Sequence, residues 1–310
     1  MTSSERPPDQ RSGRPWTLYP SPLRYPGGKR KLANFVKVLM ASNGLVDGEY
    51  AEVYAGGAAI ALELLYEEYV RRIHINDLDR GIHAFWVAAT QETDGICRRV
   101  RDTPVTIDEW RRQRDTYLAP QPDPLDLAFA TLFLNRTNRS GIVTGGPIGG
   151  LQQQGTWRID ARYRSADLLH RVEKVGRFSS RIDVSGLDGA DFIRTVVPAL
   201  PERSLVYLDP PYFVKGQEAL YSNYYRPEDH ALIAELVASL DVPWLVSYDD
   251  VPDIRALYPE AARLAYTIAY SANDRYRGAE IAFFADSLDV PAVANPSTVT
   301  KRDVLAAASA

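Results

Sequence analysis

Cysteine is almost absent from this chain of 310 residues, in which Cys97 is the only one. A single thiol excludes an internal disulfide and any zinc site built on cysteine ligands. The histidines are scattered without the spacing of a metal site, and they are His74, His83, His170 and His230. We therefore expect no metal, and the cysteine content fits a reducing, cytoplasmic compartment.

Long apolar runs are also missing. No segment is long enough to span a membrane, so we expect no membrane partner. Residues 1–17 are polar and lack the apolar core of a signal peptide, which predicts a disordered leader. Residues 288–310, rich in Ala, Ser, Thr and Val, predict a C-terminal tail with at most one short helix. An apolar content of 45% and a charged content of 25% are typical of a soluble globular protein.

A general excess of positive charge is absent as well, since the formal net charge is −4. The charge is unevenly distributed, however. Residues 98–181 contain 15 Lys/Arg and 9 Asp/Glu, so this segment carries +6 and the rest of the chain carries −10. A basic segment within an acidic protein indicates either a surface for a polyanion or a well-solvated set of arginine-rich helices.

Hydrophobic periodicity predicts an α/β fold. After a first helix at 29–40, the chain alternates between strand 50–54, helix 58–69, strand 72–77 and helix 81–100. This order is typical of a doubly wound, mostly parallel sheet. Further strands are predicted at 181–184, 205–208, 243–248, 265–270 and 280–285, with helices at 190–200 and 227–240. The last two strands have no helix between them and should form a β-hairpin.

The pattern changes between these two parts. Residues 98–180 predict an inserted, mainly helical subdomain, with helices at 106–117, 125–134 and 163–177. Six glycines between 141 and 155 predict an irregular loop or a hairpin. We therefore expect one α/β domain, built from residues 18–97 and 181–287, that is interrupted by a basic insertion.

The tetrapeptide Asp209-Pro210-Pro211-Tyr212 follows an apolar strand and is the most informative motif of the chain. The prolines fix φ and stiffen the turn. The Asp209 carboxylate and the Pro210 carbonyl offer acceptors for both hydrogens of an exocyclic amine, and the Tyr212 ring offers a stacking surface. The motif predicts a site for a flat aromatic amine, although a rigid turn that caps a strand would contain the same residues.

Two further strand ends point to the same edge of the sheet, where ligands bind in such folds. Gly56 follows the strand at 50–54, and glycine lets a ligand approach the backbone closely. Asp77 ends the strand at 72–77, where a carboxylate commonly binds ribose hydroxyls. Upstream, the segment Tyr25-Pro26-Gly27-Gly28-Lys29 predicts a lid over the same ligand. Together these residues predict a nucleoside site, whereas each alone would also fit an ordinary turn.

Four motifs, in the order in which they occur in the chain, resemble the D12 class of adenine-specific DNA methyltransferases, the DNA adenine methylase family. They are the segment from Tyr25 to Lys29, the glycine turn, the acid after the second strand and the Asp-Pro-Pro-Tyr motif. Residues 135–141, Asn-Arg-Thr-Asn-Arg-Ser-Gly, are similar to a segment of that family's recognition insertion. The resemblance implies a seven-stranded methyltransferase-type sheet, S-adenosylmethionine as methyl donor, double-stranded DNA as substrate and no metal.

The resemblance also implies roles for single residues. Its cofactor-binding positions fall on Tyr25, Lys29, Glu52, Tyr54, Gly56, Asp77, Asp191, Phe192 and Asp209. Its catalytic positions fall on Asp209, Pro210, Pro211 and Tyr212. The chain departs from the family at Val53, where proline is usual, and at Ala58 and Ala59, which replace a Gly/Ser continuation.

For DNA contacts we predict basic and amide side chains of the insertion and of the loops that flank the catalytic end. They are Arg136, Asn138, Arg139, Arg158, Arg162, Arg164, Lys215, Arg275 and Arg277. A guanidinium group suits both phosphate and guanine edges, although solvation explains each single arginine equally well.

The expected reaction is a direct in-line attack by N6 of a flipped-out adenine on the sulfonium methyl group. Methylation of cytosine N4 or of adenine in RNA remains an alternative, as does a DNA-binding relative that has lost turnover. Aspartate in the first motif position favours adenine, and the intact Asp209, Asp77 and Lys29 favour an enzyme. We expect a monomer and leave a dimer open.

Overall fold

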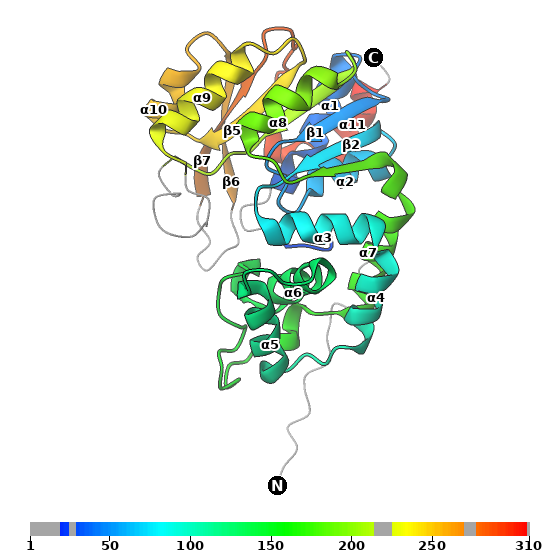
Figure 1. Cartoon of the computed structure of the whole chain (residues 1–310). Coiled ribbons are helices and arrows are strands. Elements are labelled where there is room, and N and C mark those ends of the chain that lie inside the picture. Colours follow the sequence, from blue (N-terminus) through cyan, green and yellow to red (C-terminus); the bar gives the residue numbers. More distant parts are fainter. Residues whose placement is uncertain (1–18, 25–28, 214–224, 270–276, 309–310) are drawn as a thin grey trace.

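Seven strands among the described residues form one mixed sheet in the order β3-β2-β1-β4-β5-β7-β6 (Figure 1). The computed structural model describes residues 19–24, 29–213, 225–269 and 277–308. The strands are β1 Gly48–Glu52, β2 Val70–Asn76, β3 Ile182–Ser185, β4 Ser204–Leu208, β5 Trp244–Asp249, β6 Ala262–Ala269 and β7 Arg277–Phe284. The predicted fold class is therefore confirmed, a doubly wound, mostly parallel sheet with a terminal hairpin.

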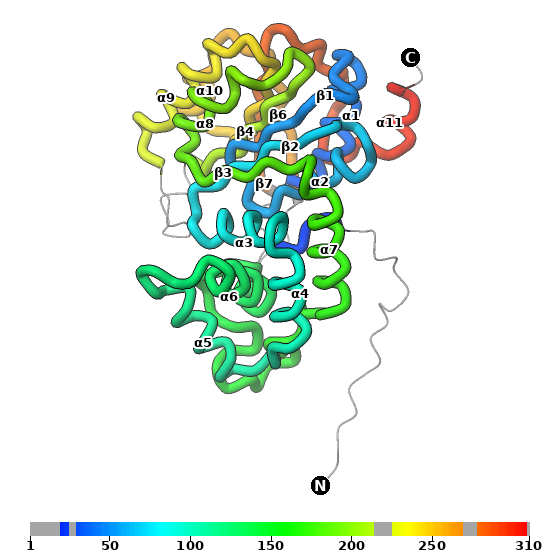
Figure 2. Tube along the Cα trace, turned by 45° about the vertical axis from the view of Figure 1, so that its right-hand side comes forward, coloured from blue at the N-terminus to red at the C-terminus, as the bar shows by residue number. Residues whose placement is uncertain are grey.

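Strands β1 to β5 pair in parallel, whereas β7 is antiparallel to both β5 and β6. The order of the strands reverses between β1 and β4. Because crossover connections are right-handed, helices on either side of this reversal cover opposite faces of the sheet. Figures 1 and 2 show α1 Ala33–Ser42 and α2 Ala59–Tyr66 over one face, and α8 Gly189–Thr195 and α9 Pro227–Ala238 over the other.

The central strands read as apolar runs because both of their faces are covered. Every residue of β4 and of β5 is buried. Ser247 and Asp249 interrupt the apolar sequence of β5, and both are buried. Buried polar groups are usually hydrogen-bonded, so these two residues require partners at the edge of the sheet.

The helices of the insertion lie apart from the sheet, beyond α3 Arg80–Gln91 in Figures 1 and 2. They are α4 Thr93–Asp102, α5 Ile107–Leu118, α6 Pro124–Thr137 and α7 Ser165–Arg177. Helix α6 forms the centre of this part, since every residue from Leu127 to Thr137 is buried. It packs against α3 on one side and α5 on the other, so the insertion rests on the helical layer that covers the sheet.

Side-chain caps explain where several of these helices begin. Asp79 accepts hydrogen bonds from the first N–H groups of α3. Asp123 does the same for α6, whose first residue is Pro124, and Thr106 caps α5. These caps satisfy N–H groups that have no partner within the helix.

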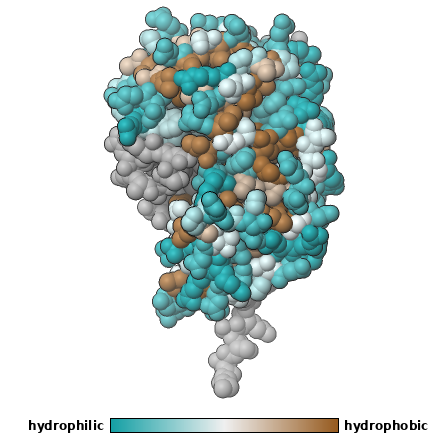
Figure 3. Space-filling model, viewed as in Figure 1, coloured by the Kyte–Doolittle hydropathy of each residue, from teal (hydrophilic) through white to brown (hydrophobic). Residues whose placement is uncertain are grey.

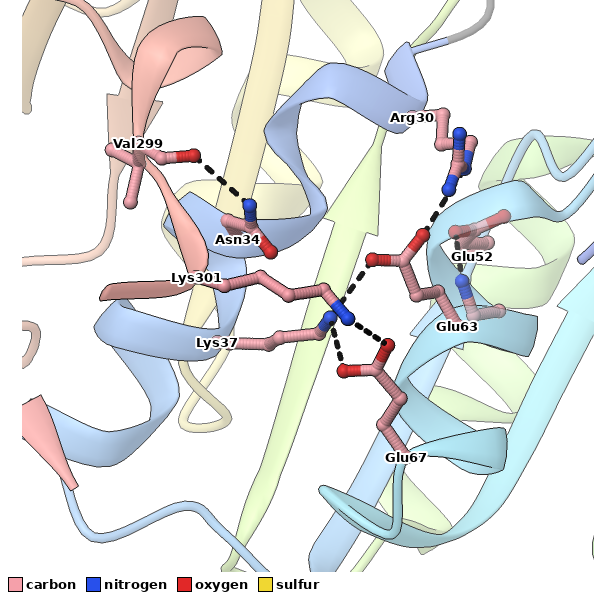
Figure 4. A network of polar contacts seen from close by, with 9 residues as sticks. Arg30, Asn34, Lys37, Glu52, Glu63, Glu67, Val299 and Lys301 are labelled. Atoms are coloured by element: carbon pink, nitrogen blue, oxygen red, sulfur yellow. Dashed lines mark hydrogen bonds and ion pairs between the residues drawn. The ribbon is translucent and has the colours of Figure 1, made fainter. Parts of the chain in front are cut away.

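The C-terminal segment returns to the sheet through η8 Pro296–Thr298 and α11 Lys301–Ala307, which pack against α1. Figure 4 shows the ion pairs beside this contact. The buried Lys37 Nζ lies 2.8 Å from carboxylate oxygens of both Glu63 and Glu67, and Lys301 Nζ lies 3.4 Å from Glu67. These pairs fasten α1, α2 and the C-terminal helix to one another.

Some element boundaries differ from the sequence prediction. The helix expected at 81–100 is two helices, α3 and α4, separated at Glu92, and the first helix begins with the 3-10 turn η2 Lys29–Leu32. Helix α10 Pro252–Leu257 was not predicted. Four short 3-10 turns complete the described structure, namely η3 Arg139–Gly141, η4 Ile159–Arg162, η5 Ser179–Arg181 and η6 Val197–Ala199.

Among the described residues, none of the helices is both long enough and apolar enough to cross a membrane. The same residues contain no group of three or more His, Cys, Asp or Glu side chains that could hold a metal ion.

Candidate active site at the carboxyl edge of the sheet

Acidic residues mark the ends of four strands at one edge of the sheet. Glu52 is the last residue of β1, and Asp249 is the last residue of β5. Asp77 directly follows β2, and Asp209 directly follows β4. Since these strands are parallel, their carboxyl ends share the edge where ligands bind in open α/β sheets.

Lys29 connects three residues of this edge. Its Nζ lies 2.7 Å from the Tyr212 hydroxyl, 2.9 Å from Glu280 Oε2 and 3.1 Å from Asp209 Oδ1. Tyr212 in turn donates its hydroxyl proton to Glu280 Oε1 at 3.1 Å. Lys29 therefore bridges the N-terminal segment, the Asp-Pro-Pro-Tyr turn and β7.

The ammonium of Lys29 also lies 4.8 Å from the centre of the Tyr212 ring. The lysine and Glu280 side chains are almost completely buried, at 1% and 0% exposure, whereas 24% of the Asp209 side chain is exposed. A buried ion pair thus supports a carboxylate that reaches the surface. We call Lys29, Asp209, Tyr212 and Glu280 the lysine cluster.

Ser247 fixes the orientation of the Asp209 carboxylate. Its hydroxyl donates to Asp209 Oδ1 at 2.8 Å and lies 2.8 Å from the Tyr207 hydroxyl. Both Ser247 and Lys29 contact the same oxygen, Oδ1. The second oxygen, Oδ2, is contacted by neither of them, and a carboxylate oxygen can accept a hydrogen bond from a ligand. The turn itself is partly anchored, because Pro210 is buried while Pro211 is partly exposed.

Glu52 is a buried carboxylate beside this cluster, with 5% of its surface exposed. Its Oε1 accepts a hydrogen bond from Ala61 N at 3.0 Å, in the first turn of α2. Burial raises the pKa of Glu52 to about 8, and the nearby Asp209 adds to this rise. Within the described part of the chain no basic side chain pairs with it, so Glu52 suits a ligand that brings a positive charge.

The glycine turn after β1 is held on both sides. Gly56 N donates to Asp77 Oδ2 at 2.8 Å, and the Gly56 carbonyl accepts from Trp86 Nε1 at 2.9 Å. Asp77 Oδ1 accepts from Asp79 N at 2.9 Å, and burial raises the pKa of Asp77 to about 6. Gly56 and Ala58 have φ angles of 47° and 44°, in the left-handed region, which is strained for an alanine. The turn is thus preformed and strained.

Tyr54 closes the turn from the side of α8. Its hydroxyl lies 3.0 Å from the Tyr225 hydroxyl. A Cβ atom at Gly189 would lie 2.4 Å from the Tyr54 hydroxyl oxygen, so glycine is required at the start of α8. Nearby in the same helix, Phe192 is buried in the core, whereas the exposed Asp191 faces Arg194 at 3.4 Å. A cofactor role for Asp191 stays a prediction.

Several predicted site residues lie outside the described residues. They are Tyr25, Lys215 and Arg275, together with the side chain of Arg277, whose backbone begins β7.

The structure separates the predicted DNA-binding residues of the insertion into two groups. Arg139, Arg158, Arg162 and Arg164 are exposed. Figure 3 shows that the insertion has a mostly hydrophilic surface on the face viewed in Figure 1. These four side chains stay candidates for contact with a polyanion.

Arg136 and Asn138 are buried instead. Arg136 donates through Nε and Nη2 to the Arg162 carbonyl, at 3.1 and 2.8 Å. Asn138 accepts from Trp110 Nε1 at 2.6 Å and donates to the carbonyls of Ile142 and Val143, at 2.9 and 2.8 Å. Both side chains are committed to the fold of the loop after α6, and the structure does not place them where DNA would reach them.

Two residues of the site were not anticipated from the sequence, Glu280 and Ser247. Glu280 opens the apolar run that ends at Phe284 and has no exposed surface. A single acid within a buried strand requires a cationic or hydrogen-bonding partner, but the sequence does not indicate which residue provides it. Nothing comparable in the sequence indicates Ser247, because a serine within an apolar strand can often satisfy its hydroxyl by a hydrogen bond to the backbone.

Comparison with known proteins identifies the family of the chain. The model of the D12 class N6 adenine-specific DNA methyltransferase family matches residues 25–271. The chain is 26% identical over 208 residues to "Modification methylase StsI" of Streptococcus sanguinis, an alignment that covers 63% of this chain and 29% of that protein. The chain thus spans well under half the length of this relative.

Two solved structures of the rRNA methyltransferase aviRa from Streptomyces viridochromogenes also align with the chain. One has a TM-score of 0.36 at 13% identity and covers 85% of this chain and 86% of the other. The second has a TM-score of 0.38 at 15% identity and covers 91% and 89%. Scores this low do not indicate a shared fold.

The family match extends from the segment before Lys29 to the hairpin after β5, and it includes the Asp-Pro-Pro-Tyr turn, the glycine turn and the insertion. The recognition made from the sequence is thereby confirmed, and the chain belongs to the D12 class of N6 adenine-specific DNA methyltransferases.

Proposed function

We propose that this protein transfers a methyl group from S-adenosylmethionine to N6 of an adenine in double-stranded DNA. Family membership supports the reaction class. The single observation that carries the proposal is the Asp209 carboxylate, which Ser247 and Lys29 hold by one oxygen at the exposed edge of the sheet.

The residues around the glycine turn fit S-adenosylmethionine by their chemistry. Glu52 is a buried carboxylate beside no basic side chain of the described residues, which suits the ammonium group of the methionine moiety. Asp77 still has lone pairs for ribose hydroxyls beyond those that bind Gly56 and Asp79. We propose that S-adenosylmethionine is also bound by Tyr54, Gly56 and Lys29, and by Tyr25, Asp191 and Phe192. When bound, S-adenosylmethionine supplies an electrophilic methyl group on a sulfonium.

We propose that Asp209 Oδ2 and the Pro210 carbonyl accept the two N6 hydrogens of an adenine that has left the base stack. With both hydrogens held in this way, the N6 lone pair would be left free to attack a sulfonium methyl group, and the new N–C bond would form as the S–C bond breaks, with that bonding pair left on sulfur. The N6 proton then leaves to solvent.

Positioning and charge would supply the acceleration. Effective molarities of well-oriented groups reach on the order of 10⁵ M or more. The Asp209 carboxylate stabilises the positive charge that grows on N6. Tyr212 is held by its hydroxyl to Lys29 and Glu280, so its ring has a fixed place beside Asp209, and Pro211 stiffens the turn between them.

For DNA we propose contacts from Arg139, Arg158, Arg162 and Arg164, which are exposed on the insertion. Lys215, Arg275 and Arg277 are proposed to hold the strand near the flipped base. Arg136 and Asn138 would contribute by shaping the loop that carries Arg139. We also propose a cytoplasmic location.

Product analysis tests the proposal. Labelled S-adenosylmethionine and unmethylated DNA are incubated with the protein, and the nucleosides are then separated. Label in N6-methyladenine that disappears with Asp209→Ala supports the proposal. Label in N4-methylcytosine, or in RNA only, would replace the proposed substrate. Wild-type rates in Asp209→Asn would contradict the role given to the carboxylate charge.

A further inference from the structure

Asn76 is a buried amide at the edge of the sheet where the proposed donor residues lie. It is the last residue of β2 and directly precedes Asp77, and 1% of its surface is exposed. Strand β2 lies between β1 and β3 in the sheet. Because burial removes the amide from solvent, its hydrogen-bonding groups require partners on the neighbouring strand ends.

The side chain of Asn76 bonds to the ends of both neighbouring strands. Its Nδ2 donates to the Val53 carbonyl, directly after β1, and to the Leu187 carbonyl, after β3, both at 2.9 Å. Its Oδ1 accepts from Leu187 N at 2.8 Å and from Ser185 Oγ at 2.9 Å. Both amide hydrogens and both lone pairs of the oxygen are therefore used. A carboxylate of the same shape could not satisfy the two carbonyls.

The main chain beside Asn76 makes the same connection. Ala55 N donates to the Asn76 carbonyl at 2.8 Å, and Asp77 N donates to the Ser185 carbonyl at 3.2 Å. Main-chain and side-chain bonds together therefore hold residues 53–55 on one side of β2 and residues 185–187 on the other.

The two segments that the amide joins lie beside residues proposed to bind the methyl donor. Residues 53–55 include Tyr54 and directly follow Glu52. Residues 185–187 lead to α8, whose first residue is Gly189, and a Cβ atom there would lie 2.4 Å from the Tyr54 hydroxyl oxygen. The segments thus meet a second time at the start of α8. The amide sets the separation between the end of β1 and the loop before α8.

We propose that Asn76 is a positioning residue for the methyl donor. The inference rests on the proposed function, in which Glu52, Tyr54 and Asp77 bind S-adenosylmethionine. A ligand held from several strand ends binds more tightly when those ends are already in place, because less freedom is lost on binding. Asn76 is almost completely buried and its hydrogen bonds are all made within the protein, so it acts through its neighbours and not by contact with the donor.

Asn76→Asp tests this role with little change in volume. The substitution keeps an acceptor for Leu187 N and Ser185 Oγ, but it replaces the donating nitrogen by an oxygen that faces two carbonyls. An added negative charge would by itself attract a cationic donor. A loss of affinity therefore reports the lost hydrogen bonds and not the new charge.

Asn138→Asp is the matched control. Asn138 is also buried, accepts one N–H from Trp110, and donates to the carbonyls of Ile142 and Val143. The substitution breaks the same kind of bonds, but within the insertion, where no contact with the donor is proposed. It therefore separates a general loss of stability from a loss of donor binding.

The measurement is the Kd of labelled S-adenosylmethionine without DNA, by equilibrium dialysis, with urea unfolding of each protein in parallel. We expect Asn76→Asp to weaken donor binding at least about tenfold, the effect of leaving one buried acceptor without its donor. Asn138→Asp should keep this Kd within about threefold of wild type, since its site is separate, although both variants lose stability. At saturating donor, Asn76→Asp should keep kcat within about threefold of wild type and show its loss in KM for the donor.

Hydrogen exchange in the wild type tests the proposal without any variant, and so covers an Asn76→Asp protein that does not fold. The amides of Ala55 and Leu187 both donate to oxygens of Asn76. Saturating S-adenosylmethionine should slow exchange at both amides, because binding restrains the two segments together. The Ile148 amide, bonded to the Thr137 carbonyl within the insertion, should exchange at an unchanged rate.

Four results would overturn the proposal. They are a folded Asn76→Asp protein that keeps the wild-type Kd, an equal loss of donor affinity in Asn138→Asp, a loss of kcat at saturating donor without a change in Kd, and exchange at Ala55 and Leu187 that the donor does not slow. A wild type that binds no S-adenosylmethionine would instead contradict the proposed function itself, and this inference with it.

Discussion

Glu280 offers the sharpest test of the lysine cluster. Glu280→Gln keeps the shape of the side chain but removes the charge of one carboxylate that lies within ion-pair distance of the buried Lys29, the other described one being Asp209. Leaving one partner of a buried pair unbalanced costs about 3–5 kcal/mol. Asp209 still faces Lys29 at 3.1 Å and is partly exposed, so we expect a smaller loss in the free energy of unfolding, about 2–3 kcal/mol.

A double-mutant cycle with Lys29→Met isolates the pair. Urea unfolding of the wild type, both single variants and the double variant gives the coupling energy. We expect the double variant to be more stable than the sum of the single losses predicts by about 1–3 kcal/mol, because each single variant leaves a buried charge and the double variant leaves none. Losses that add within about 0.5 kcal/mol would refute the buried pair.

Three further predictions concern the site and the insertion. Ser247→Ala should lower kcat by about tenfold or more, because a hydrogen bond to a charged group contributes about 1.5–3 kcal/mol. The control Ser204→Ala removes a buried hydroxyl that has no hydrogen-bond partner among the described residues, and it should leave kcat unchanged. Equal effects of the two substitutions would contradict the orientation of Asp209 by Ser247. The affinity for S-adenosylmethionine should rise from pH 6 to 7.5 by up to about tenfold per pH unit, because Glu52, with a pKa of about 8, must lose its proton to bind a cation. Calorimetry should find that the affinity of Glu52→Gln does not depend on pH in this range. A pH dependence that persists in this variant would exclude Glu52 as its source. The double variant Arg139→Gln/Arg158→Gln should bind DNA more weakly and reduce the magnitude of the slope of log K against log salt by about 1.8. The control double variant Arg263→Gln/Arg302→Gln, with its substitutions on β6 and α11, should leave this slope unchanged. The opposite pattern would contradict a DNA-binding surface on the insertion.

The sheet and its edge were predictable because their signals are local. Apolar runs such as β4 end in acids or glycine, and parallel pairing brings those ends together. Helix limits were less predictable, since the cap by Asp79 and the break at Glu92 depend on single side chains within a continuous helical pattern.

The roles of single polar residues were the least predictable part. Arg136 and Arg139 are the same residue type three positions apart, yet one is buried against a carbonyl and the other is exposed. Residue type gives charge but not direction, and the direction is set by how α6 packs against the rest of the insertion. Glu280 likewise became recognisable as a partner of Lys29 only once β7 lay beside β5.

The most direct test of the central claim is single-turnover methyl transfer to unmethylated DNA by the wild type and by Asp209→Ala, with DNA affinity measured on the same samples. We predict N6-methyladenine from the wild type, a rate at least about 10³-fold lower in the variant, and DNA affinity within about threefold, because Asp209 would act on the reacting amine and not on the duplex. A variant that keeps its rate within about tenfold of wild type would contradict the assignment of Asp209 as the residue that holds the target amine.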